Sequence, residues 1–367
     1  MEETQHHRLV VRKPLVPSWS VIDDVDERRI YMQQLRKDWG GDTQKRTTGR
    51  CTTVPPPGCQ PKSLSRDDLA SHIFTNEFLI TLKSDGVRYT LYLTTRPTTC
   101  TKDPCAVALM IGRNSTMYEI EVAAPEDFFT KGTILEGELV WKQPGEVSMI
   151  FLVFDCVRLK GDVLINVPFR ERIQMICANV NTNLDIGETT SVAMEDVNGI
   201  QILHYNPPFT LRVKDFVERK YAAKLWINRH HTDVLVDGLI MYRADAYYQP
   251  NSRSNNSCFK WKERATIDLS GPQLKTSDEL PLPGTLFNRS LKIDVKSRIV
   301  PQHDDSIIEY TIYTKTDEIL LFAIRNRPDK ISANSLKVVK ATISDVMEEL
   351  SVEEISGEVN GNKRQRE

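Results

Sequence analysis

Five short segments rich in β-branched and aromatic residues follow one another between Glu77 and Arg158, and this composition predicts β-strands in this part of the chain. Several alternate apolar and polar residues with a period of two, the spacing of a strand that buries one face. Turn-forming residues separate them. We therefore expect a sheet-based domain containing the stretches 78–82, 88–94, 106–111, 117–122 and 149–155.

Helical patterns flank these strands. A helix is expected over 20–39, where Ser20 is a candidate N-cap and acidic residues crowd the first turn. Ser65 is expected to cap a short helix that runs toward Phe74. Further elements are expected as helices over 169–178 and 210–224 and as a strand over 234–242.

After Arg264 the pattern changes to many short β segments with Gly, Pro and Asn between them. This pattern is typical of a small five-stranded barrel of about 80 residues. A terminal helix is expected over 337–350, and the polar tail 351–367 is expected to be disordered.

Composition narrows the class of protein. The chain has 48 Lys and Arg against 50 Asp and Glu, a formal net charge of −2, which argues against a generic polyanion-coating protein but allows a locally basic groove. No apolar run approaches the roughly 20 residues that span a bilayer, and the N-terminus lacks the shape of a signal peptide. Seven cysteines without framework spacing fit a reducing compartment. We expect a soluble intracellular protein.

Several nucleotide and metal motifs are missing from the sequence. It has no G-x-x-x-x-G-K-[ST] phosphate loop and no G-x-G-x-x-G that opens a helix. It also lacks H-E-x-x-H, C-x-x-C and G-x-S-x-G. Any nucleotide chemistry must therefore use another kind of site.

The stretch from Lys83 to Arg88 (KSDGVR) is the most informative for chemistry. A lysine where a strand meets a Gly-containing turn can lie beside other cations, and desolvation and like charge then lower its pKa and leave a neutral amine as nucleophile. Gly86 lets backbone approach a phosphate, and Arg88 offers a charge-assisted donor. Taken alone, the stretch also fits a surface hairpin, because Asp-Gly is a common turn signal.

Four further segments follow Lys83 along the chain: Glu136-Gly137-Glu138, Phe154-Asp155, Asp237-Gly238 and Lys260-Trp261-Lys262. In order and spacing these segments resemble the motifs of the covalent nucleotidyltransferase superfamily, which contains mRNA capping enzymes and ATP-dependent ligases.

Two other stretches resemble the mRNA guanylyltransferases within that superfamily. The sequence PGCQP at 57–61 is similar to the segment before their lysine motif, and Ile324–Lys330 (IRNRPDK) is similar to their R-x-D-K motif. The resemblance covers roughly residues 55–345. The chain departs from the family pattern at Glu136, where Asp is usual, and at Glu263, where Pro often follows the second lysine. These departures suit a divergent or viral member.

The resemblance implies an α+β fold. A nucleotidyltransferase domain built on antiparallel β-sheets with flanking helices is expected to precede a C-terminal OB-fold barrel domain. The expected division is an N-terminal extension over 1–54, the nucleotidyltransferase domain over 55–263, the OB-fold domain over 264–336, a helix over 337–350 and the tail over 351–367.

The resemblance also implies a two-step reaction. Lys83 attacks the α-phosphorus of GTP and pyrophosphate leaves, after which the 5′-diphosphate end of RNA attacks the Lys–GMP phosphoramidate to give GpppRNA. Negative charge builds on phosphate oxygens in both steps, so cations must converge there. Lys260 and Lys262 fit, because period-two spacing places both on one strand face. A divalent cation, Mg²⁺ or Mn²⁺, is implied, with Asp237 as its ligand and Glu138 on the ribose or the metal.

The other implied GTP contacts are matched residue by residue to the family. Phe154 matches an aromatic that stacks on the purine, Arg113 matches an arginine near the ribose, and Lys214 matches a lysine that reaches guanine O6 and favours G over A. The small barrel is implied to close over GTP and exclude water. Its implied contacts are Asp268, Arg327, Asp329 and Lys330.

Other interpretations stay open. Lys260 and Lys262 also fit a solvated edge strand, and Phe154 also fits a core aromatic. Glu119 and Glu121 fit either a solvent-facing strand or the carboxylate pairs of a tunnel-type RNA triphosphatase. For the whole chain, the alternatives are an ATP-dependent RNA or DNA ligase that forms Lys–AMP and a non-catalytic nucleic-acid-binding scaffold. The PGCQP segment disfavours the ligase, and the intact lysines disfavour the scaffold.

The implied chemistry also suggests partners and a location. GTP and the 5′-diphosphate RNA end are the substrates, and we expect a separate RNA triphosphatase, a separate cap methyltransferase and docking on RNA polymerase. No membrane association is expected. The expected location is the nucleus for a cellular protein, or a cytoplasmic viral factory or virion for a viral one.

Overall fold

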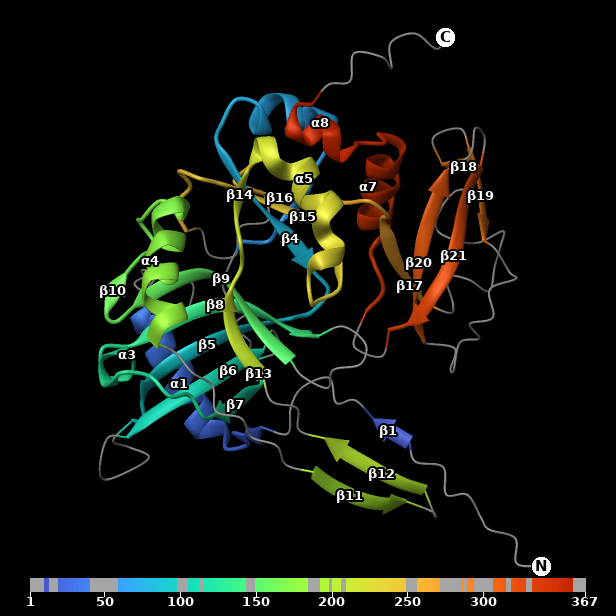
Figure 1. Ribbon diagram of the computed structural model, residues 1–367. Coiled ribbons are helices and arrows are strands. Elements are labelled where there is room, and N and C mark those ends of the chain that lie inside the picture. Colours follow the sequence, from blue (N-terminus) through green and yellow to red (C-terminus); the bar gives the residue numbers. More distant parts are fainter. Residues whose placement is uncertain are drawn as a thin grey trace, which may run out of the picture.

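The computed structural model describes residues 10–12, 19–39, 59–97, 105–112, 115–142, 149–183, 192–197, 200–205, 209–248, 256–270, 285–286, 289–293, 306–314, 318–327 and 332–358. Two mainly antiparallel sheets form the larger part of the molecule, and a third sheet lies beside them (Figure 1). None of the described helices is long and apolar enough to cross a membrane.

The first sheet contains the β-rich segments predicted from the sequence. Its strands are ordered β10 (Asp162–Val163), β9 (Met149–Leu159), β8 (Thr133–Trp141), β5 (Val87–Thr95), β6 (Ala106–Gly112), β7 (Met117–Ile120) and β2 (Ser20–Val21). These neighbours pair antiparallel, and β13 (Phe209–Val213) adds to β9 in parallel.

The second sheet carries Lys83, which lies in its strand β4 (Phe78–Ser84). The order of this sheet is β14 (Val217–Glu218), β4, β15 (Val236–Arg243), β16 (Cys258–Lys262) and β3 (Lys62–Ser63). Residues of both sheets share one core, in which Leu79 and Tyr242 of the second sheet join Leu91 and Phe151 of the first. The two sheets therefore face each other, and polar residues at the margin of this core can form a site between them.

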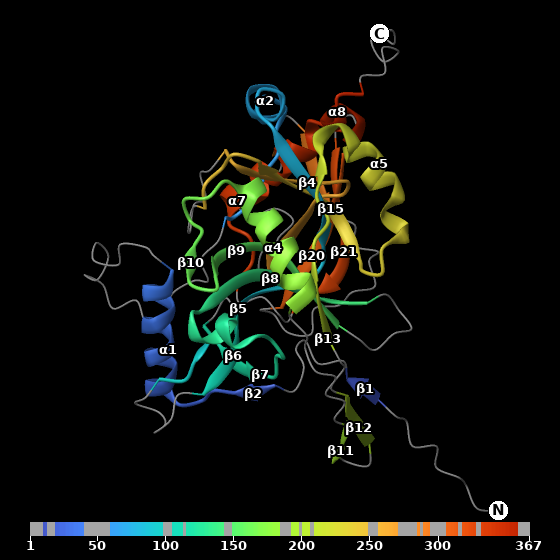
Figure 2. The same cartoon turned by 60° about the vertical axis from the view of Figure 1, so that its left-hand side comes forward.

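Helices complete both cores. On the first sheet, α1 (Val25–Asp38) packs on the face turned away from the second sheet. The helices α3 (Glu126–Thr130) and α4 (Phe169–Asn183) bury their apolar residues in the core that the two sheets share, and α4 lies against β9 and β13 (Figure 2). The second sheet is covered by η2 (Leu69–Ile73), which follows α2 (Arg66–Asp68), and by the run of η3 (Arg219–Tyr221), α5 (Ala222–Ile227) and η4 (Asn228–His231). Asp24, rather than Ser20, caps α1, because its side chain accepts a hydrogen bond from the backbone of Glu27.

The third sheet has the order β17 (Thr266–Ser270), β20 (Ile307–Thr314), β21 (Glu318–Asn326), β19 (Arg289–Ile293) and β18 (Thr285–Leu286). It packs on α7 (Leu336–Met347) (Figure 1). The antiparallel α+β character is thus confirmed, whereas closure of these strands into an OB-fold barrel stays a prediction. A small separate sheet joins β1 (Val10–Arg12), β12 (Ile200–Tyr205) and β11 (Val192–Val197).

Two predictions about the C-terminal half are wrong. The helix expected over 210–224 is mostly extended chain, because residues 210–213 belong to β13 and the α-helix begins only at Ala222. The tail expected to be disordered from 351 contains α8 (Val352–Ser356), with Ser351 and Glu354 forming a capping box. Its apolar residues pack beside α5 in the core under the second sheet, which orders a segment that is polar overall (Figure 1). Residues 359–367 lie outside the described part.

Candidate active site

The candidate nucleophile Lys83 pairs with the candidate metal ligand Asp237. Lys83 Nζ lies 2.7 Å from Asp237 Oδ1, and Lys262 Nζ lies 2.7 Å from Asp237 Oδ2. Burial tends to raise the pKa of Asp237, but the charges of Lys262 and Lys83 outweigh it and hold that pKa below its usual value. The carboxylate is therefore kept ionised between two ammonium groups.

Strand register brings these groups together. Gly238 on β15 lies opposite Lys83 on one side and Lys262 on the other, so both lysines project from the same face of the sheet. A Cβ atom at position 238 would lie only 2.0 Å from the carbonyl oxygen of Trp261, so glycine is required for this close strand approach.

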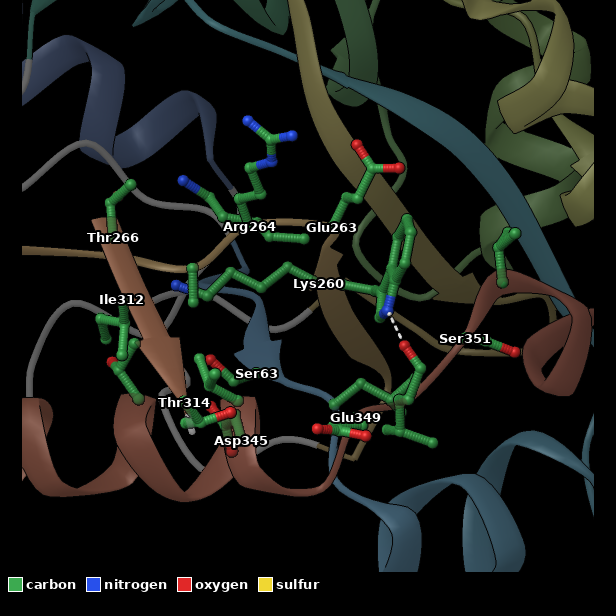
Figure 3. A pocket seen from close by; sticks show the side chains of 18 of the residues that line it. Ser63, Lys260, Glu263, Arg264, Thr266, Ile312, Thr314, Asp345, Glu349 and Ser351 are labelled. Carbon is green, nitrogen blue, oxygen red and sulfur yellow. Dashed lines mark hydrogen bonds between the residues drawn. The ribbon is translucent and has the colours of Figure 1, made fainter. Parts of the chain in front are cut away.

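Lys260 adds a third cation to the same strand face. Burial, together with the charges of Lys262 and Lys83, lowers the pKa of Lys260. In Figure 3 its side chain extends into a pocket between the second and third sheets, with Thr266 and Ile312 on one side and Asp345 of α7 on another. The pocket has a volume of about 690 Å³. Burial raises the pKa of Asp345 to about 6.

A second polar cluster forms where Lys214, directly after β13, reaches the end of β4. Lys214 Nζ donates to Ser84 Oγ at 2.6 Å and lies 3.2 Å from Glu138 Oε2, and Ser84 also donates to Glu138. Only 5% of the Lys214 side chain is exposed. Burial lowers the pKa of Lys214, and Glu138 opposes that shift. A buried ammonium beside one carboxylate is a strong donor for any acceptor group of a ligand that reaches it.

Arg88 is mostly buried beside the core that the two sheets share. Its Nη2 is 2.7 Å from Glu136 Oε2, its Nη1 donates to the carbonyl oxygen of Cys59 at 3.0 Å, and its Cζ is 5.1 Å from the Phe154 ring centroid. Phe154 belongs to the shared core and is 9% exposed, so its predicted stacking on a purine stays a prediction.

Two arginines of the third sheet form ion pairs with carboxylates of the same sheet. Arg327 Nη1 lies 3.2 Å from Asp268 Oδ1 and 3.3 Å from Glu309 Oε2. Arg325 Nε lies 2.7 Å from Glu309 Oε2. Arg327 and Asp268 were expected here from the sequence, whereas Arg325 and Glu309 were not. Arg325 and Glu309 lie opposite each other in the paired strands β20 and β21, a relationship that no local sequence pattern marks. Arg113, Asp329 and Lys330 lie outside the described residues.

Carboxylates for a metal ion are few. In the described ranges, no cluster of three or more His, Cys, Asp or Glu side chains is arranged to hold one. Asp237 and Glu138 are hard oxygen donors that suit Mg²⁺ or Mn²⁺, and such a cation usually completes its shell with substrate phosphates and water. The donor set therefore fits a metal that arrives with a triphosphate. Glu119, considered above for a triphosphatase, instead lies 2.6 Å from Arg96.

The comparisons with known proteins bear on the family. A family model described as mRNA capping enzyme, catalytic domain, matches residues 25–264, about two thirds of the chain. The chain belongs to the mRNA capping enzymes. The match covers the first two sheets except strand β2, it includes Lys83, Asp237 and Lys262, and it confirms the resemblance drawn from the motifs.

Individual relatives carry the same name. This capping-family chain is 27% identical over 217 residues to the mRNA-capping enzyme subunit alpha of Yarrowia lipolytica. The matched region is 57% of this chain and 51% of that protein. It is 25% identical over 342 residues to the subunit alpha of Schizosaccharomyces pombe, covering 83% and 79%. The chain thus spans about half the length of the Yarrowia protein. Among solved structures, a mycobacterial DNA ligase D complexed with ATP and MES is similar at a TM-score of 0.40 and 14% identity, covering 74% of the chain and 95% of the ligase chain.

Proposed function

We propose that this capping-family chain is a GTP:RNA guanylyltransferase whose covalent intermediate is Lys83–GMP. The observation that carries the proposal is the row formed by Lys83, Asp237 and Lys262 across Gly238. In the first step a bond forms between Nζ and the α-phosphorus, the bond to pyrophosphate breaks, and the amine loses a proton. In the second step a terminal oxygen of the 5′-diphosphate RNA displaces Nζ and gives GpppRNA.

The cations near Lys83 supply electrostatic stabilisation. Lys260 and Lys262 extend from the strand face that carries the nucleophile, so both can contact oxygens of the α-phosphate as charge develops. Asp237 and Glu138 would hold a divalent cation, which would neutralise part of the triphosphate charge when bound. Asp237 also orients the Lys83 amine through its 2.7 Å contact.

The remaining contacts would select and enclose GTP. Lys214 would donate to guanine O6, Phe154 would stack on the base, and Arg88 and Arg113 would bind the ribose–phosphate portion. The third sheet, proposed to be part of an OB-fold barrel, would close over the triphosphate. Its contacts would be Asp268, Arg327, Asp329 and Lys330, and closure would exclude water from the phosphoramidate.

Partners and location follow from the reaction. The relatives are named as alpha subunits, which supports a separate partner subunit for this chain as well. We assign the RNA triphosphatase and the cap methyltransferase to other proteins, with docking on RNA polymerase and a nuclear location, because capping acts on nascent RNA ends.

A label-transfer experiment tests the proposal. The protein is incubated with α-labelled GTP or ATP and Mg²⁺ or Mn²⁺, denatured and separated on a gel. We expect acid-labile label from GTP in wild type and in a Lys224→Ala control on the exposed face of α5, and none in Lys83→Ala. Label from ATP instead would support a ligase, and no label from either nucleotide would favour the scaffold.

A further inference from the structure

Arg88, Glu136 and Tyr248 form a buried series of hydrogen bonds. Glu136 is 1% exposed, and its two oxygens are divided between two donors. Oε2 lies 2.7 Å from Arg88 Nη2, and Oε1 accepts a 2.8 Å hydrogen bond from the Tyr248 hydroxyl. Tyr248 is itself only 6% exposed, so water cannot readily replace its hydroxyl.

The direction of the Tyr248 hydroxyl is set by its surroundings. Its backbone N–H donates to the carbonyl of Ile165 at 2.9 Å, and its ring lies near Trp39, with 6.4 Å between ring centroids. On another side Arg172 Cζ is 5.6 Å from the ring centroid. Arg172 is in turn fixed by a bidentate pair with Asp155 at 2.7 and 2.9 Å.

These contacts also connect the N-terminal helix to the site. Trp39 directly follows α1, and it packs in the core of the first sheet together with Tyr31 and Leu35 of that helix. The helix therefore supports the ring of Tyr248 from outside, although it contributes no residue to the proposed GTP contacts.

We propose that Tyr248 is a positioning residue for GTP binding, which holds Arg88 through Glu136. The inference rests on the proposed function, because Arg88 is taken to contact GTP. Glu136 can keep one oxygen on the guanidinium only while its other oxygen has a donor. Without the Tyr248 hydroxyl, a buried carboxylate oxygen loses its partner and the carboxylate turns to recover one. The Nη2 side of Arg88 then loses its contact with Glu136, and its Nη1 contact with the Cys59 carbonyl does not fix the guanidinium in the same orientation.

The test uses two adjacent tyrosines. Tyr248→Phe removes the hydroxyl at the buried position, and Tyr247→Phe removes the same group from a neighbour that is 57% exposed. Because Arg88 would bind GTP equally in the ground and transition states, Tyr248→Phe is expected to raise KM for GTP in enzyme–GMP formation by about three- to tenfold, with kcat changed by less than about twofold. Tyr247→Phe is expected to match wild type. An unchanged KM in Tyr248→Phe, or an equal rise in both variants, would overturn the proposal.

A double-variant cycle separates positioning from a merely structural role. In an Arg88→Ala background, Tyr248→Phe is expected to have no further effect on KM, because the group that it positions is gone. If Tyr248→Phe instead raised KM by the same factor in the Arg88→Ala background as in wild type, Tyr248 would not act through Arg88. Thermal melting of each protein checks folding, and if Tyr248→Phe fails to fold, Glu136→Gln in the same cycle tests the same path.

Titration of GTP binding distinguishes the two proposals. If wild type binds GTP but forms no covalent label, the proposed function fails, while the same cycle measured in Kd still decides the role of Tyr248. If wild type binds no GTP, both fail.

Discussion

Arg325 Nη2 of the third sheet lies 3.6 Å from Asp85 Oδ2, two residues after the proposed nucleophile Lys83. Both side chains are about half exposed, at 51% and 45%. An exposed ion pair contributes about 0–1 kcal/mol and is screened by salt. The contact between the third sheet and the turn after Lys83 is therefore weak, which fits the proposed closure of this sheet over GTP.

The neighbouring arginines are expected to differ in function. Arg327 is 16% exposed and lies between Asp268 and Glu309, whereas Arg325 is half exposed. If Arg327 exchanges these carboxylates for phosphate oxygens, Arg327→Ala should reduce the rate of enzyme–GMP formation about tenfold or more, because charged hydrogen bonds are lost. Arg325→Ala should reduce it by less than about threefold. Quench-flow label transfer measures both rates, and equal losses would contradict the assignment of Arg327.

Replacement of Lys214 is expected to change base selection. Lys214→Met keeps the length of the side chain but removes the buried ammonium beside Glu138. Discrimination between GTP and ATP, measured as the ratio of kcat/KM values for labelling, should fall by about tenfold or more, because a charged donor to the base is lost. Lys220→Met, at an exposed lysine of η3, is the control. Unchanged discrimination in Lys214→Met would place base recognition elsewhere.

The packing of α8 predicts a stability effect far from the site. Ile355 is fully buried beside Trp226 and Trp261, so Ile355→Ala should lower the free energy of unfolding by about 2–5 kcal/mol. Val338 on α7 is 45% exposed, and Val338→Ala should change it by less than about 0.5 kcal/mol. Urea denaturation measures both. Near-equal values would mean that α8 does not pack as described.

Asp345 predicts a pH-dependent effect on stability. Burial raises its pKa to about 6 in the folded protein, so the folded state binds the proton more tightly than the unfolded chain does. The stability cost of the ionised carboxylate therefore grows as pH rises from about 4 to 6 and is fully present above that range. Asp345→Asn should raise the urea midpoint at pH 7.5 and leave it nearly unchanged at pH 4. A larger increase in the urea midpoint at pH 4 than at pH 7.5 would contradict the raised pKa of Asp345.

Local sequence patterns were sufficient where strands and motifs coincide. The strands over 78–155 and the shared face of Lys260 and Lys262 follow from period-two spacing. The N-terminal helix was also expected, but over 20–39; it begins only at Val25, with Asp24 as its cap, and Ser20–Val21 form strand β2 instead. The meeting of Lys83 with Asp237, however, depends on the pairing of β4 with β15 across 154 positions of sequence, and it was expected only because of the family resemblance.

The misses have physical causes. Residues 210–224 carry apolar residues at helix-like spacing, but parallel pairing of β13 with β9 overrides that local preference and places Lys214 beside Ser84. The polar residues after 351 concealed Val352 and Ile355, which become ordered only because the second sheet offers an apolar face. The link from Tyr248 to Glu136 spans 112 positions, and no local signal marks it.

The central claim is that Lys83 carries GMP, and peptide mass spectrometry after incubation with GTP and Mg²⁺ tests it most directly. The account predicts one guanylyl group on the peptide that contains Lys83, its removal when 5′-diphosphate RNA is added, and no adduct in Lys83→Ala. An adduct on another lysine, or one that persists in Lys83→Ala, would contradict the account.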